Sequence, residues 1–314
     1  MDTAPLDTAP PIIEAHGLAK SFGSRTAVRD VGLTVPAGCA FGFLGHNGAG
    51  KTTVIRMLTG LTRPSAGTIR IAGRSLADHR EQVLAQVGAI IEEPRFHLHL
   101  TGRENLQVIA AARGPQARQR IEPALARAGL ADRGDERVHS YSQGMRQRLG
   151  IARCLLADPR LVILDEPMNG LDPGGILELR ELIAGLVAEG RTVFLSSHLL
   201  DEIEKTCHAA AVIDRGRIIA QGAIKDLIGD THTEYELTCD RPQVALGILA
   251  AHPALAQASQ IPGGLRITLA DPRAAGAVSA LLVRAGITVL SFAPVRASLA
   301  DRFLGLTSRV GENA

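Results

Sequence analysis

The stretch Gly45-His46-Asn47-Gly48-Ala49-Gly50-Lys51-Thr52 (GHNGAGKT, residues 45–52) decides the fold. It matches the pattern G-x-x-x-x-G-K-[ST], and it lies between a short apolar run at 40–44 and a helical segment that should end near Gly60. Glycines let the backbone wrap a polyphosphate with its N–H groups pointing inward, and the helix start adds positive potential. The stretch therefore predicts a phosphate-binding loop on an α/β fold.

The loop residues have separate expected roles. Lys51 should reach the β- and γ-phosphates of ATP, and the Thr52 hydroxyl should bind Mg²⁺. The alternative is a chance glycine-rich turn, which is disfavoured because lysine is rare in this chain and because a strand and a helix flank the motif. The residues expected to contact the nucleotide here are Gly45, His46, Asn47, Gly48, Ala49, Gly50, Lys51, Thr52 and Thr53.

Two carboxylates follow a second apolar run. Residues 161–164 read LVIL, a pattern typical of a strand buried on both faces, and Asp165 and Glu166 come directly after it. Asp165 is placed to hold Mg²⁺ beside Thr52, and Glu166 is placed to act as the general base that polarises a water. In the alternative interpretation the two carboxylates only cap the next element.

His198 follows the next predicted strand, at 192–197. The order strand, helix, strand predicts a parallel sheet with crossover helices, so this strand should neighbour the one at 161–164. There His198 would sense the γ-phosphate and position the attacking water. A lone His after a strand is more often structural, and only the combination with the other motifs favours catalysis.

Residues 140–148 read SYSQGMRQR and resemble the signature of ABC ATPases (L-S-G-G-Q-x-Q-R). Residues 169–172 (NGLD) resemble the D-loop of that family, and Phe22 stands where its adenine-stacking aromatic would be. The resemblance covers about residues 12–229. It implies a P-loop NTPase core with an antiparallel β subdomain and a helical signature subdomain, and hydrolysis of ATP.

The resemblance also implies partners. In this family Ser142, Gln143 and Gly144 would face the nucleotide bound by a second copy, so two ATP molecules lie between the subunits of a homodimer. A separate integral membrane permease would be the other partner, with the chain peripheral on the cytoplasmic face of the membrane. The alternative for Ser142 is a plain helix cap.

The chain departs from the family pattern at three points. Gln143 and Met145 stand where Gly and Gln are usual, and Glu92 takes the position of the Q-loop Gln. This Glu-for-Gln pattern resembles the subunits of bacitracin-resistance and lantibiotic self-protection exporters. We expect Glu92 to bind Mg²⁺ or the attacking water and to couple hydrolysis to the permease; alternatively it caps a turn. His97 and His99 give only a weak indication of a metal site.

Outside the core, residues 1–11 read as a disordered tail without the features of a signal peptide, and residues 230–314 as a small α+β domain. In that domain we expect strands at 235–239, 265–269 and 287–292, with helices at 243–251 and 274–285. Residues 298–304 resemble the closing helix of many exporter subunits. The domain is expected to regulate or support dimerisation; alternatively it only covers apolar surface.

Composition excludes several classes of function. A net charge of +2 and an aromatic content of 3% give no reason to expect a nucleic-acid partner. No apolar run is long enough for a membrane span, and four scattered cysteines indicate a reducing cytosol.

The leading prediction is the ATPase subunit of an exporter of an antibiotic, peptide or lipid-like compound. An importer subunit, or a soluble ABC ATPase acting on ribosomes or DNA, is the alternative.

Overall fold

The structure, a computed structural model, describes residues 10–228, 234–295 and 299. These residues form two compact units with the boundary between Ile224 and Lys225. Most of the expected N-terminal tail and most of the closing helix lie outside the described residues. Among the helices that the structure describes, none has the length and apolar character needed to cross a membrane.

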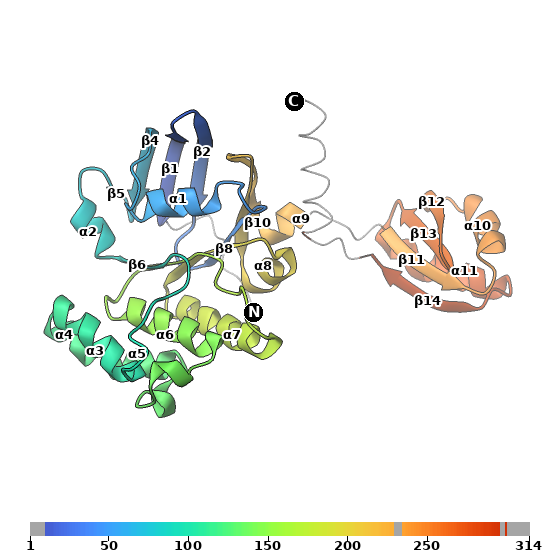
Figure 1. The fold of residues 1–314 in the computed structure, drawn as a ribbon. Helices are drawn as coiled ribbons and strands as arrows, with labels where there is room; N and C mark the ends of the chain where they lie inside the picture. Colours follow the sequence, from blue (N-terminus) through green and yellow to red (C-terminus); the bar gives the residue numbers. More distant parts are fainter. Residues whose placement is uncertain (1–9, 229–233, 296–298, 300–314) are drawn as a thin grey trace. The chain divides into compact units, whose positions relative to one another are not determined.

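An antiparallel sheet forms one side of the first unit (Figure 1). It consists of β1 (Ile13–Phe22), β2 (Arg25–Val35), β4 (Ala66–Ile71) and β5 (Arg74–Ser75) in the order β2-β1-β4-β5. The buried residues of β1 and β2 are all apolar and belong to the main hydrophobic core, while the residues between them are at least partly exposed, as a sheet with one covered face requires. The predicted antiparallel β subdomain is confirmed.

A six-stranded sheet of the order β10-β9-β3-β8-β7-β6 carries the site. Its strands are β3 (Ala40–Leu44), β6 (Val87–Ile90), β7 (Leu161–Leu164), β8 (Thr192–Ser197), β9 (Ala209–Asp214) and β10 (Arg217–Ala223). All neighbours are parallel except β9 and β10. The carboxyl ends of β3, β8 and β7 therefore meet at one edge, as the sequence predicts for a P-loop NTPase core.

Helices connect these strands. The loop after β3 leads into α1 (Lys51–Leu58), the loop after β7 into α7 (Pro173–Ala188), and the end of β8 into α8 (Leu200–Thr206). Asp172 caps α7 by accepting from the Gly175 amide, and Pro173 takes its first position, as predicted. The short α2 (Arg80–Leu84) precedes β6, and α9 (Ile224–Ile228) follows β10.

Four helices form a separate group on the side of the six-stranded sheet opposite to β1, β2 and β4 (Figure 1). They are α3 (Gly102–Arg113), α4 (Pro115–Gln119), α5 (Ile121–Arg127) and α6 (Gln143–Leu155), with single 3₁₀ turns at Ala131–Arg133 and Val138–Ser140. Thr101 and Glu104 form a capping box at the start of α3, and Ser142 caps α6. This group is the expected helical signature subdomain.

The second unit has the order β-α-β-β-α-β, a ferredoxin-like split βαβ arrangement. Its elements are β11 (Glu234–Cys239), α10 (Pro242–Ala250), β12 (Leu255–Ile261), β13 (Gly264–Leu269), α11 (Ala275–Arg284, after a 3₁₀ turn at Pro272–Ala274) and β14 (Val289–Pro294). The sequence did not predict β12. This strand lies at the sheet edge, and its LAQASQI sequence has no fully buried residue, so it lacks the pattern of a half-buried strand.

Candidate functional site

The phosphate loop closes tightly against its neighbours. Gly50 has φ +112°, and a Cβ there would lie 2.9 Å from the Ala27 carbonyl oxygen, so only glycine fits this position without strain. Because Gly50 has no side chain to cap α1, the first N–H groups of this helix are available to an anion. Lys51 is 5% exposed, and its Nζ donates to the carbonyl oxygens of Gly45 at 2.6 Å and His46 at 3.3 Å.

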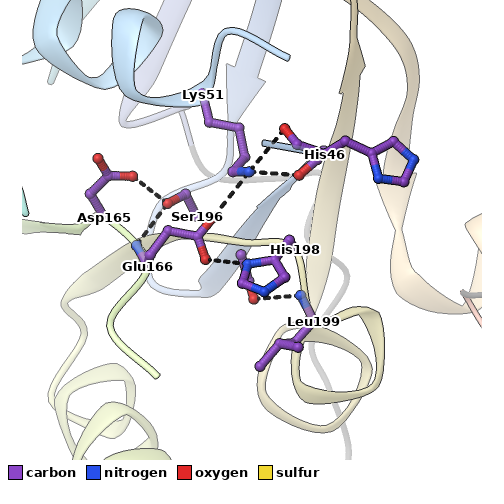
Figure 2. A network of polar contacts seen from close by, with 9 residues as sticks. His46, Lys51, Asp165, Glu166, Ser196, His198 and Leu199 are labelled. Atoms are coloured by element: carbon purple, nitrogen blue, oxygen red, sulfur yellow. Dashed lines mark hydrogen bonds and ion pairs between the residues drawn. The ribbon is translucent and has the colours of Figure 1, made fainter. Parts of the chain in front are cut away.

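Asp165 and Glu166 share one partner at the end of β7 (Figure 2). The Ser196 hydroxyl donates to Asp165 Oδ1 at 2.6 Å, and its oxygen accepts from the Glu166 backbone amide at 2.9 Å. Asp165 is 7% exposed and Ser196 is fully buried. Sequence reasoning missed Ser196. Its only signal was a hydroxyl near the end of the strand that neighbours the one with the carboxylates.

Glu166 lies between two other predicted site residues (Figure 2). Its Oε1 is 3.0 Å from Lys51 Nζ, and its Oε2 is 2.9 Å from His198 Nδ1. Glu166 also has φ +49°, a left-handed conformation that is uncommon for a residue with a Cβ. The segments that follow β3, β7 and β8 thus place the Lys51 ammonium, the Glu166 carboxylate and the His198 imidazole next to one another in a row.

A cavity of about 420 Å³ opens beside Lys51 and Glu166 of this row, and His198 is not part of its lining. Its lining includes nine of the expected site residues, with Phe22 and Glu166 among them, and two that were not expected, Arg25 and Ala27. The lining residues are Phe22, Arg25, Ala27, His46, Asn47, Gly48, Gly50, Lys51, Thr52, Thr53 and Glu166. A cavity of about 460 Å³ beside the C-terminal end of α1 has no carboxylate in its lining, so it lacks the groups for this chemistry.

The donor set suits Mg²⁺ bound together with phosphates. Thr52 lines the cavity and offers a hydroxyl, and Asp165 offers a carboxylate at the end of β7. Mg²⁺ prefers oxygen ligands and usually takes only one or two from the protein beside a phosphate. Among the described residues, His97 and His99 included, no three or more His, Cys, Asp or Glu side chains form a cluster that could hold a metal ion.

The signature residues lie outside this cavity. Ser142 caps α6 by accepting from the Met145 amide at 3.2 Å, so the plain-cap role is real. The side chain of Gln143 donates to the backbone oxygen of Asn169 at 3.1 Å, which links α6 to the loop after β7. Gly144 is half-buried on the first turn of α6. A single chain therefore does not bring these three residues to its own phosphate loop.

Glu92 also lies outside the cavity. Its side chain is 65% exposed and forms an ion pair with Arg56 Nη2 on α1 at 2.6 Å. Among the described residues, its side chain forms no hydrogen bond or ion pair with Asp165, Glu166 or Thr52. Its expected roles toward Mg²⁺ and water stay predictions. Sequence reasoning missed Arg56, for which the only signal was its position four residues after Thr52 on the same helix.

Comparison with known proteins gives consistent matches. Residues 28–169 match the family model described as ABC transporter. The chain is 37% identical over 296 residues to the bacitracin transport ATP-binding protein BcrA of Bacillus licheniformis, covering 94% of this chain and 97% of that protein. It is 39% identical over 237 residues to the Nod factor export ATP-binding protein I of Ralstonia nicotianae, covering 74% and 72% of the two chains. A solved ATP-binding subunit of an ABC transporter superposes with a TM-score of 0.61 at 33% identity, covering 69% of this chain and 91% of that one.

Proposed function

Because this chain belongs to the ABC transporter family of ATP-binding proteins, which hydrolyse ATP to power transport, we propose that it is the ATPase subunit of an exporter with a separate membrane permease. The observation that carries the proposal is the row Lys51–Glu166–His198, of which Lys51 and Glu166 line the cavity. This row supplies a cation for the transferred phosphoryl group, a carboxylate base and an imidazole that orients it.

The hydrolytic step follows from this arrangement. Lys51 and the N–H groups at the start of α1 bind the phosphates and offset the negative charge that develops on them. Glu166 accepts a proton from the attacking water, and the contact of 2.9 Å with His198 Nδ1 fixes the orientation of its carboxylate. When bound between Thr52 and Asp165, Mg²⁺ would neutralise phosphate charge. Ser196 holds Asp165 in place for that role.

The base of ATP would lie at the other end of the cavity. Phe22 is 54% exposed and lines the cavity, and Lys20 Nζ lies 5.1 Å from the centroid of its ring. With an ammonium over the ring, Phe22 has a restricted orientation that suits stacking on adenine. Arg25 also lines the cavity, as a second cation beside Lys51, and would contact the ribose or the α-phosphate.

A second copy of the chain would complete the site. Ser142 and Gln143 are exposed at the start of α6, where backbone N–H groups and the helix dipole favour an anion. This end would face the γ-phosphate held by the partner's loop, and hydrolysis would release the two copies. The ferredoxin-like unit would support or regulate this dimer, since its own core makes it a separate compact body.

The relatives support export. One is named for bacitracin transport and one for Nod factor export, which supports an exporter of an antibiotic, peptide or lipid-like compound over an importer. A soluble ABC ATPase acting on ribosomes or DNA gains no support from these relatives. The chain would lie on the inner face of the cell membrane and bind it through the permease.

The test begins with a search of the neighbouring coding sequences for a multi-span membrane protein, which is then co-expressed with this chain. We expect the two to purify together, to hydrolyse ATP with Mg²⁺, and to raise the tolerance of a sensitive host to the cargo, with bacitracin as the first compound tried. Lys51→Ala should abolish turnover and tolerance while the complex still forms. A wild-type complex that neither binds nor hydrolyses ATP would overturn the proposal. ATP hydrolysis accompanied by uptake of the cargo would show that the transporter is an importer and not an exporter.

A further inference from the structure

A cation on the helix after the phosphate loop holds the side chain of Glu92. Arg56 Nη2 donates to Glu92 Oε1 at 2.6 Å. Arg56 lies in the last turn of α1, four residues after Thr52, so both side chains project from the same side of the helix. Among the described residues neither Arg56 nor Glu92 forms a second ion pair. In this structure the contact holds the Glu92 carboxylate beside α1.

The backbone of Glu92 lies near the hydrolytic carboxylates although its side chain does not. Ile90 at the end of β6 pairs with Leu164, and its carbonyl oxygen accepts from the Asp165 amide at 2.9 Å. Glu92 follows two residues later, and two residues of extended chain span at most about 7 Å. Glu92 has φ +64°, a conformation that is unfavourable for a residue with a Cβ and that often marks a functional turn.

Charge explains why this carboxylate needs a partner. Glu166 already stands beside the Lys51 ammonium at the phosphate end of the cavity, and the Asp165 carboxylate directly precedes it in the chain. A third carboxylate there would repel the other two and would add a ligand for Mg²⁺. A glutamine in this position would carry no charge, so it would neither repel the other two nor form an ion pair, and the positive charge on α1 has an ionic partner only because residue 92 is a glutamate.

We propose that Arg56 is a positioning residue for Glu92, and that their ion pair keeps the Glu92 carboxylate away from the metal and the attacking water until the pair opens. The inference rests on the proposed function and adds a regulatory step to the same site. Arg56 is 46% exposed and Glu92 65% exposed, so the pair is screened by water and weak. A permease segment that contacts either side chain can therefore open it.

The Mg²⁺ concentration that half-saturates binding of a fluorescent, non-hydrolysable ATP analogue tests this directly. The full-length chain is compared as wild type, Arg56→Gln, Glu92→Gln and the double variant. Because Arg56→Gln frees a carboxylate for Mg²⁺, we expect its half-saturating Mg²⁺ concentration to fall about two- to five-fold, the range that an exposed pair can supply. In the Glu92→Gln background, Arg56→Gln should leave the half-saturating Mg²⁺ concentration unchanged.

Two further variants separate charge from general effects on α1. Arg56→Lys keeps the positive charge and should retain most of the wild-type behaviour. Arg63→Gln removes an arginine from the loop after α1 that forms no ion pair with Glu92, and it should leave the Mg²⁺ requirement unchanged. Thermal unfolding of each variant shows whether the fold is intact, because loss of an exposed pair should change stability little.

Three outcomes would overturn the role of Arg56. They are no change in Arg56→Gln, a higher Mg²⁺ requirement, or a decrease of equal size when Glu92 is already Gln. Each of these leaves the proposed function standing if the wild-type chain binds the nucleotide. Failure of the wild-type chain to bind any nucleotide contradicts the proposed function instead, so the two failures are distinguishable.

Discussion

The hydroxyl of Ser196 donates a hydrogen bond of 2.6 Å to Oδ1 of Asp165, across two neighbouring strands of the parallel sheet. Its oxygen also accepts from the backbone amide of Glu166 at 2.9 Å. One buried side chain therefore orients the candidate Mg²⁺ ligand and the turn that carries the candidate base. The geometry of the hydrolytic end depends on this residue of β8 as much as on the carboxylates themselves.

Ser196→Ala should weaken Mg²⁺ binding and destabilise the fold. The substitution leaves the 7% exposed Asp165 carboxylate without this donor, and an unsatisfied buried polar group costs about 1–3 kcal/mol. Denaturant unfolding measures the stability, and Mg²⁺ titration of ATP analogue binding measures the site. Ser197→Ala is the matched control, because Ser197 is equally buried and its hydroxyl accepts from the Leu199 amide instead. An equal effect of both variants on Mg²⁺ binding would contradict the role of Ser196.

Glu166→Gln should reduce turnover by at least about 100-fold while ATP still binds, and should accumulate an ATP-bound dimer. Glutamine keeps the size of the side chain and a hydrogen bond to His198, but it cannot accept the proton from water. Single-turnover hydrolysis and gel filtration with ATP measure the two effects. Glu178→Gln, which removes a surface partner of Arg148, is the control and should hydrolyse ATP normally. Normal turnover by purified Glu166→Gln would remove Glu166 as the base.

The link between Gln143 and the loop after β7 should appear as energetic coupling. Gly170 has φ +72°, and a Cβ there would lie 2.6 Å from Gln143 Nε2. Gly170→Ala should therefore destabilise the protein by about 1–2 kcal/mol through backbone strain alone, and displace the Gln143 amide as well. Gln143→Gly removes the clash but not the strain. Measured by denaturant unfolding, the double variant should recover only the part of the lost stability that is due to the clash, and purely additive effects would show that the link is inert.

Phe22→Ala should raise the KM for ATP by about ten-fold, because base–aromatic stacking contributes about 1–3 kcal/mol to binding. It should leave kcat nearly unchanged, because the base lies far from the phosphate that reacts. Phe22→Tyr retains the ring and should behave like wild type. Leu61→Ala removes another exposed apolar side chain, 66% exposed and outside the cavity lining, and serves as the control. A lower kcat with an unchanged KM would show that Phe22 acts on the chemistry instead of on binding.

Local sequence determined most of the fold. The glycines and Lys51 of the loop, the apolar run at 161–164 and the Asp172–Pro173 helix start each depend on neighbours within a few residues, and each element formed as predicted. Parallel strands follow from the alternation of strands and helices, so the meeting of Lys51, Glu166 and His198 could also be expected. The edge strand β12 could not, because its exposed residues carry no periodic pattern.

Tertiary structure alone decided which side chains face one another. Ser196 and Asp165 are 31 residues apart, and Arg56 and Glu92 are 36 apart. Residue types and spacing gave no indication that a serine would orient the carboxylates or that an arginine would hold Glu92 at α1. Such pairs arise when packing fixes the rotation of two elements about their axes, and that rotation depends on the whole core and not on any local stretch.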